Sequence, residues 1–205
     1  MSKPIMSILI PHYNTPAGRR TAVVCVDRLL ENTRSQHVDI VLHSARGDNF
    51  QIWNDLAQAA RSDVLALWCF DQYPAPGWDI AALNAYSPTT LVTIPNCENG
   101  FSPSHEANAV ASFGMSPEAF DRSAFDTWAM DATRNNVLCW QFPWIINRDA
   151  FLDLGGFPKF EFRSQAWEMT DKAFFDKWLD AGYVTERAYT WVYHLMRWAY
   201  TGDTR

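Results

Sequence analysis

Apolar residues along the chain follow two alternating patterns: short continuous runs, and runs at helical spacing. Continuous runs predict buried strands over Ile5–Ile10, Val38–His43 and Val64–Phe70. Between them, apolar side chains three or four residues apart predict helices over Ala17–Asn32 and Phe50–Arg61. Three strands alternating with two helices within about seventy residues predict an α/β fold with a mostly parallel central sheet.

The pattern loosens in the rest of the chain. Further helices are predicted over Trp78–Ala85, near Pro117–Phe125, over Asn147–Leu154 and over Thr170–Ala181, and further strands over Thr90–Pro95, Val137–Ile146 and Tyr183–His194. The stretch Asn96–Asn136 has no clean period and is rich in Ser, Asn, Phe and Asp. Long irregular segments of compact domains are usually functional, so this one is a candidate for contact with a ligand.

Polar residues follow the first three predicted strands at their carboxyl ends. They are the turn His12–Asn14, the loop Ser44–Asn49 and the side chain of Asp71. Parallel sheets bind ligands at this edge, so the three segments are expected to share one rim. Asp71 follows seven apolar residues, and a carboxylate there can hold a divalent cation against a diphosphate. The structural alternative is an aspartate that opens a Pro-rich turn.

A second group of candidate residues lies near the carboxyl end of the chain. Glu168 and Asp171 are three residues apart at the start of a predicted helix, which places them on nearly one face. Either could act as a general base, although acidic residues are common at helix starts. His194 lies in an apolar segment, where it could be a ligand, although a core or edge residue is the more common case. The HExxH, GxSxG, Walker and GxGxxG motifs are all missing from the sequence.

Composition narrows the class of protein. The chain has 205 residues, which suits a single domain spanning 1–205. Its net charge of -6 argues against a basic groove for nucleic acid. Aromatic residues make up 15%, enough both to fill a core and to line a cleft. The sequence shows no signal peptide, and its four cysteines are scattered, so the chain is expected to be cytoplasmic. It has no run of about 18 apolar residues and is therefore not expected to span a membrane.

Four segments in fixed order carry a resemblance to a known family. ILIPHYNTP is similar to an opening strand and loop, and NFQIWNDLAQAARSDVLALWCFDQYPAPGWDIAAL to a helix followed by a metal-binding strand. INRDAFLDLGGF and WEMTDKAFFDKWLDAGY are similar to the segments before and at an acceptor site. Together they resemble a short, divergent GT-A glycosyltransferase of the family 2 type, from Ser7 to about His194.

The resemblance implies roles for residues in the first half of the chain. Pro11, Tyr13 and Asn14 match positions that surround the nucleotide base, and Asn54 matches an asparagine of the following helix. On this basis residues 1–95 form the nucleotide-sugar-binding half, and 96–205 the acceptor and catalytic half. The Asn96–Asn136 segment is then the expected lid on the acceptor side.

The resemblance also implies a metal site and a catalytic base. Asp71 matches the last acid of the DxD motif, and His194 matches a late histidine that helps to hold Mn²⁺ or Mg²⁺. Cys69 stands where the first DxD acid is expected. Glu168 and Asp171 remain alternative bases, with Asp171 preferred. The acid that usually follows the first Glu of this pair is replaced by methionine in this chain.

The implied reaction is an inverting transfer of a sugar from a nucleotide diphosphate sugar, expected to be a UDP-sugar, to an acceptor hydroxyl. The acceptor could be a glycan, a lipid-linked sugar, a protein or a modified nucleotide base. One alternative is a GT-A-like module that binds the nucleotide sugar without catalysis. A nucleotidyltransferase fits poorly, because HYNTPAGRR has a single glycine where that class has a Gly-rich loop. The stretch before Asn54 is also short, as if one strand–helix unit of the family were missing.

Overall fold

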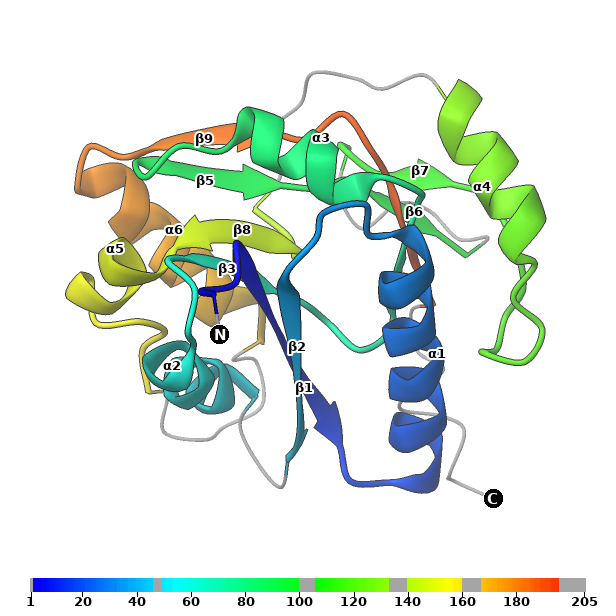
Figure 1. The fold of residues 1–205 in the computed structure, drawn as a ribbon, viewed down its shortest axis with the longest axis horizontal. Coiled ribbons are helices and arrows are strands. Elements are labelled where there is room, and N and C mark those ends of the chain that lie inside the picture. Colours follow the sequence, from blue (N-terminus) through cyan, green and yellow to red (C-terminus); the bar gives the residue numbers. More distant parts are fainter. Residues whose placement is uncertain (1, 46–48, 100–105, 133–139, 160–166, 196–205) are drawn as a thin grey trace.

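A computed structural model of the chain describes residues 2–45, 49–99, 106–132, 140–159 and 167–195. The described residues form two sheets with helices packed around them (Figure 1). The larger sheet has six strands in the order β2 (Val38–Ala45), β1 (Met6–Tyr13), β3 (Val64–Leu67), β8 (Trp144–Asn147), β5 (Thr90–Thr93) and β9 (Val184–Arg187). The smaller sheet has four strands in the order β4 (Gln72–Pro74), β10 (Val192–His194), β6 (Asn96–Glu98) and β7 (Ala109–Val110).

Most strands of the larger sheet run parallel to a neighbour. β1 pairs in parallel with β2 and β3, and β5 pairs in parallel with β9. β8 is antiparallel to both β3 and β5, between which it lies. The predicted α/β fold with a mainly parallel central sheet is therefore confirmed, with one antiparallel strand in its middle.

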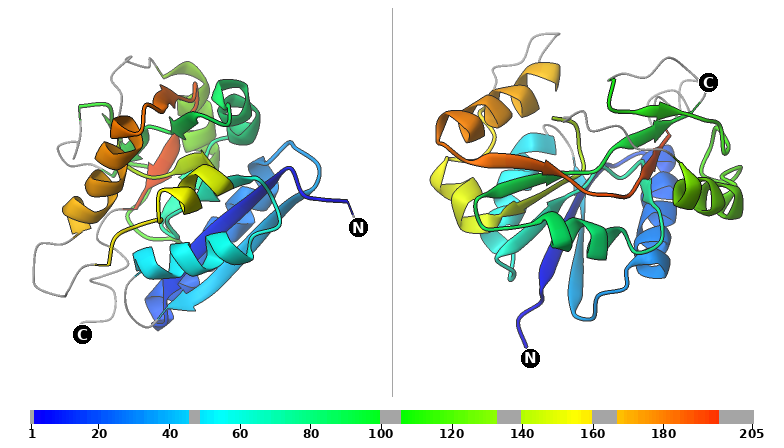
Figure 2. Two further views of the ribbon diagram at one scale, coloured as in Figure 1. Left: turned by 90° about the vertical axis from the view of Figure 1, so that its left-hand side faces the viewer. Right: turned by 90° about the horizontal axis from the view of Figure 1, so that it is seen from above.

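Helices cover both faces of this sheet. They are α1 (Pro16–Asn32), α2 (Asn49–Ala59), α3 (Trp78–Ala85), α4 (Arg122–Asp131), α5 (Arg148–Asp153) and α6 (Trp167–Asp180). In Figure 1 α1 and α4 lie on one side of the molecule and α2, α5 and α6 on the other, and the left-hand view of Figure 2 looks onto α2 and α5. The strands between these layers are covered on both sides, which explains their continuous apolar runs.

Successive side chains of the central strands enter different cores. Along β1, Ile8 and Ile10 belong to the cluster packed against α1 and α4, whereas Leu9 belongs to the cluster packed against α2 and α6. In β3, Leu65 and Leu67 face the second cluster, and the residue between them faces the first. The period of two in a strand thus serves two cores at once.

Helix α1 begins where the sequence provides a cap. The Thr15 hydroxyl accepts a hydrogen bond from the Gly18 N–H at 3.0 Å, and Pro16 follows in the first turn. A Cβ added at Gly18 would lie 2.4 Å from the Tyr13 carbonyl oxygen. The small residue lets the helix start directly against the end of β1.

Four predicted strands differ from the structure by three residues or more. Ile5–Ile10 continues as β1 to Tyr13, so His12 and Tyr13, expected in a turn, belong to the strand. Val64–Phe70 ends as a strand at Leu67, because the chain then turns and Gln72 N donates to the Cys69 carbonyl at 3.1 Å. Tyr183–His194 is two strands, β9 and β10, in separate sheets. Of Val137–Ile146, residues 137–139 lie outside the described residues, and the strand β8 starts after Pro143, which has no N–H to donate to a ladder.

The helix predicted near Pro117–Phe125 is displaced toward the carboxyl end. Helix α4 begins at Arg122, because the Asp121 carboxylate caps it by accepting from the Ala124 N–H at 3.0 Å. The prediction missed this cap because the segment before it has no helical period. Among the helices that the structure describes, none is long and apolar enough to cross a membrane.

Candidate functional site

Asp71 and His194 are far apart in the chain and come together in the fold. Asp71 lies in the turn between β3 and β4, and His194 is the last residue of β10, the strand paired with β4. Its Nε2 is 3.6 Å from Asp71 Oδ2. The next residue, Leu195, donates its N–H to the Asp71 carbonyl at 3.0 Å. Pairing of β10 with β4 thus brings these two side chains close together.

Both side chains are partly withdrawn from solvent. The exposed fraction is 8% for the Asp71 side chain and 23% for that of His194. Burial by itself would lower the pKa of His194, but the carboxylates of Asp71 and Glu98 outweigh it and raise this pKa above its ordinary value. His194 Nδ1 is buried and has no hydrogen-bond partner among the described residues. The imidazole therefore sits between two negative groups.

The pair fits a divalent cation as a partial ligand set. A carboxylate oxygen and an imidazole nitrogen are both ligands for Mn²⁺. Two ligands about 2.1 Å from one cation at a right angle are about 3 Å apart, so the separation of 3.6 Å needs only a small adjustment. The described residues contain no group of three or more His, Cys, Asp or Glu side chains able to hold a metal. The remaining ligands would have to come from substrate phosphates or water.

Cys69 belongs to the same turn as Asp71. Its N–H donates to Gln72 Oε1 at 3.3 Å, which helps to close the turn. Burial raises the pKa of the Cys69 thiol well above its usual value, and the charges of Asp71 and Asp171 raise it further. The thiol is therefore neutral at physiological pH, and it adds no negative charge to this turn.

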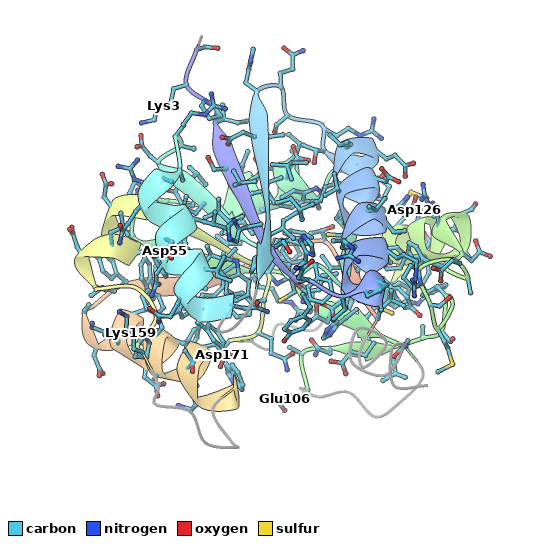
Figure 3. All side chains as sticks on the ribbon, turned by 90° about the horizontal axis from the view of Figure 1, so that it is seen from below. Lys3, Asp55, Glu106, Asp126, Lys159 and Asp171 are labelled. Atoms are coloured by element: carbon cyan, nitrogen blue, oxygen red, sulfur yellow. The ribbon has the colours of Figure 1, made fainter. Side chains whose placement is uncertain are left out.

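The two candidate bases lie at the start of α6. The half-buried Asp171 accepts a hydrogen bond from the N–H of Lys172 at 2.9 Å, and Figure 3 labels it at this end of the helix. Glu168 is in the same helix, but its side chain lies outside what the structure describes. The structure thus describes the Asp171 side chain at the start of α6 and leaves the choice between the two bases open.

The residues expected around the nucleotide base lie at the end of β1. Pro11 is buried and is paired in register with His43 of β2. Tyr13 packs edge-on against Phe70, with 5.4 Å between the ring centroids, so it adjoins the turn that carries Asp71. Asn14 is exposed, and its Oδ1 accepts from an Arg19 nitrogen at 2.7 Å. These three residues and Asp71 therefore share one edge of the sheet.

Asn54 has a structural partner in the fold. Its Nδ2 donates to the Phe157 carbonyl at 2.9 Å, and its Oδ1 accepts from the Phe157 N–H at 2.8 Å. A Cβ added at Gly156 would lie 2.4 Å from the same Oδ1. The amide thus joins α2 to the turn after α5. Glycine at position 156 leaves the space that the amide oxygen occupies. Contact of Asn54 with a nucleotide stays a prediction.

A buried polar network beside His194 was missed in the sequence. Gln72, His194 and Glu98 are register partners across β4, β10 and β6, so their side chains share one face of the small sheet. Asn108 Nδ2 donates to Glu98 Oε1 at 2.9 Å and to Gln141 Oε1 at 2.7 Å. The strands come from distant parts of the chain, so no spacing in the sequence could reveal the network.

Comparisons with known proteins identify the fold. No family model matches the chain, and no curated protein sequence matches it. A solved structure of GalNAc-T7 with UDP, GalNAc and Mn²⁺ superposes on 94% of this chain with a TM-score of 0.59. The chain has the GT-A fold. The sequence identity is 12%, so the likeness is one of fold, and this GT-A chain matches 44% of the length of that protein.

Proposed function

We propose that this GT-A chain is a metal-dependent, inverting glycosyltransferase of the family 2 type that uses a nucleotide diphosphate sugar. The observation that carries the proposal is the approach of His194 Nε2 to Asp71 Oδ2, at 3.6 Å, beside the end of β1. The solved neighbour contains UDP, GalNAc and Mn²⁺, which makes a UDP-sugar with Mn²⁺ the first donor to test.

In the proposed reaction, the residues at the edge of the sheet orient the donor. Pro11, Tyr13 and Asn14 would receive the base, and Asp71 and His194 would hold a divalent cation. The cation, when bound, supplies positive charge against the charge that develops on the leaving group. Cys69 contributes a neutral thiol here, so Asp71 provides the negative charge of this turn.

A carboxylate at the start of α6 completes the proposed reaction. Asp171, or Glu168 as the alternative, accepts the proton of the acceptor hydroxyl as its oxygen attacks the anomeric carbon. The new carbon–oxygen bond forms on the face opposite the diphosphate. The bond to the diphosphate breaks, and the leaving group takes the electron pair. The anomeric configuration is thereby inverted.

Donor binding is tested by thermal unfolding with a panel of nucleotide diphosphate sugars, each with and without Mn²⁺. A donor at a hundred times its Kd stabilises the folded chain by about 2.7 kcal/mol, which raises the Tm of a chain of this size by roughly 5–10 °C. We expect a metal-dependent rise that Asp71→Asn removes. Asp27→Asn, the same change at an exposed position of α1, should leave the rise intact.

If no donor in the panel raises the Tm, the proposed nucleotide-sugar site is overturned. A metal-dependent rise that survives in Asp71→Asn would remove Asp71 from the site. The Tm of each variant is first measured without ligand, and the rise is counted from that value. A loss of folding is then not mistaken for a loss of binding.

The catalytic base is tested with Asp171→Asn and Glu168→Gln. The variant that removes the base should lose turnover by about 10²–10⁴-fold, because proton transfer in the transition state is lost, while donor binding stays unchanged. Asp180→Asn, at the exposed far end of α6, is the matched control. If both test variants keep the wild-type rate, neither carboxylate is the base.

One observation favours a second candidate function, a module that binds the nucleotide sugar without catalysis. Burial and two carboxylates keep Cys69 neutral where the family resemblance expects an acid. Calorimetry that shows donor binding to a chain with neither transfer nor hydrolysis would establish this function in place of the first.

A further inference from the structure

The strand β2 is an open edge of the six-stranded sheet. It pairs with β1 over all eight of its residues, and no other described strand pairs with it. Figure 3 looks onto this edge, with β2 between α2 and α1 and no other ribbon drawn over it. The hydrogen-bonding groups on the outer side of β2 are therefore available to another strand.

The two edges of the sheet differ in how they are protected. The opposite edge, β9, is a four-residue strand, Val184–Arg187, that carries Glu186 and Arg187. Short length and charge are two of the devices that keep sheet edges from pairing. β2 is twice as long, contains no proline or lysine, and keeps an unbroken register with β1. Its Leu42 side chain is 44% exposed. Of these two devices, β2 has only the charge of Asp39 and lacks the short length.

The sequence of β2 is complementary to itself in one antiparallel register. If Val41 lies on a two-fold axis, Asp39 of each copy is opposite His43 of the other, and Ile40 is opposite Leu42. Asp39 and His43 lie on one face with Val41, and Ile40 and Leu42 lie on the other. An acid–imidazole pair and an aliphatic pair each occur twice, as a two-fold interface requires.

In one copy, Asp39 is paired with an arginine and is mostly buried, with 17% of its side chain exposed. Arg61 donates to Asp39 Oδ2 at 3.1 and 3.2 Å. Asp39 Oδ1 has no hydrogen-bond partner among the described residues. This oxygen is buried within one copy, so an imidazole of a second copy would reach it only after the Asp39 side chain turns outward. His43 is exposed at the outer edge, where a second copy would meet it.

We propose that two copies of this chain pair through β2, antiparallel and centred on Val41, so that their sheets join into one. The inference rests on the edge strand alone and does not depend on the proposed function. Because the paired strands run in opposite directions, the carboxyl ends that carry the two candidate sites point away from each other.

The oligomeric state of the whole chain is measured by sedimentation over a concentration series. We expect wild-type chain at twice 23.5 kDa and Leu42→Lys at 23.5 kDa, because a lysine would lie opposite Ile40 of the second copy. Val23→Lys changes a residue that is 56% exposed on α1 and should remain a dimer. Leu42 is exposed in one copy, so its replacement should leave the fold and the Tm of the monomer unchanged.

The register is tested by two changes at one position. His43→Asp places like charges opposite each other twice and should raise the dimer Kd by about tenfold, whereas His43→Lys should preserve or lower it.

A wild-type chain that is monomeric at every concentration overturns the proposal and leaves the edge to a strand of another protein. A dimer that survives Leu42→Lys, or equal Kd values for both His43 variants, overturns it as well. Donor binding by monomeric Leu42→Lys separates this outcome from that of the proposed function.

Discussion

At the scale of single residues, the charge state of His194 depends on its neighbours more than on its own burial. Burial disfavours the imidazolium form, yet Asp71 and Glu98 favour it enough to raise the pKa. The protonated form therefore contributes stability that is fully present below the ordinary value of 6.5 and is lost as the pH rises through the folded-state pKa.

This balance predicts the titration of the metal-free chain. We expect NMR to give a pKa above 6.5 for His194 in the wild type and a lower one in Asp71→Asn, since the variant removes a negative charge 3.6 Å away. Asp27→Asn should not change the titration, because Asp27 lies on the exposed face of α1. An unchanged His194 pKa in Asp71→Asn would show that the two side chains are not close in solution.

At the scale of elements, the structure gives Asn54 a role that its position in a motif does not reveal. Its amide ties α2 to the turn after α5 through both backbone groups of Phe157. The turn itself uses Gly155 and Gly156 at φ values of 81° and 63°, which glycine adopts without strain. The motif therefore stabilises the packing of two helices on one face of the sheet.

Replacing Asn54 by alanine should destabilise the chain by about 1–3 kcal/mol, because the Phe157 N–H loses its acceptor. Urea unfolding measures this loss, and Asp55→Ala on the exposed side of α2 should stay within about 0.5 kcal/mol of wild type. If Asn54→Ala keeps full stability but loses donor affinity, the amide acts on the nucleotide as the family resemblance predicts.

The accuracy of the sequence prediction also belongs to the element scale. Trp78–Ala85 coincides with α3, and Asn147–Leu154 contains α5, because a cap at Asn147 and two glycines bound that helix. The strand predicted over Val64–Phe70 ends three residues early, at Leu67, because an apolar run looks the same in a strand and in a buried turn. Trp68 shows this, since its ring is in the core while its Nε1 donates to the Gln72 carbonyl at 2.8 Å.

At the scale of the whole molecule, one buried arginine joins three elements. Arg28 of α1 is 2% exposed, contacts Asp126 of α4, and donates to the Pro74 carbonyl of β4 at 3.3 Å. It also donates to Glu31 at 3.2 Å. A nearby pair, Arg122 with Glu31, joins the same two helices at the surface, where both side chains are more than 40% exposed.

Replacing each of these two arginines should lower the free energy of unfolding by a different amount. Arg28→Ala should destabilise the chain by about 3–5 kcal/mol, because Asp126 would be left partly buried without its partner. Arg122→Ala should cost less than about 1 kcal/mol, since its ion pair is exposed to water. Urea unfolding of both variants, with hydrogen exchange across α4, measures the difference. Equal losses would mean that the buried contact does not hold α4 in place.

Local patterns in the sequence were enough to predict the alternation of strands and helices and the polar residues that follow the strands. These features are local, because hydrophobic period, caps and turn residues act over a few positions. Tertiary structure decided which of these residues meet. It placed β8 between β3 and β5, divided Tyr183–His194 between two sheets, and brought His194 close to Asp71. Strand order and register depend on contacts between distant segments, and no spacing along a single chain encodes them.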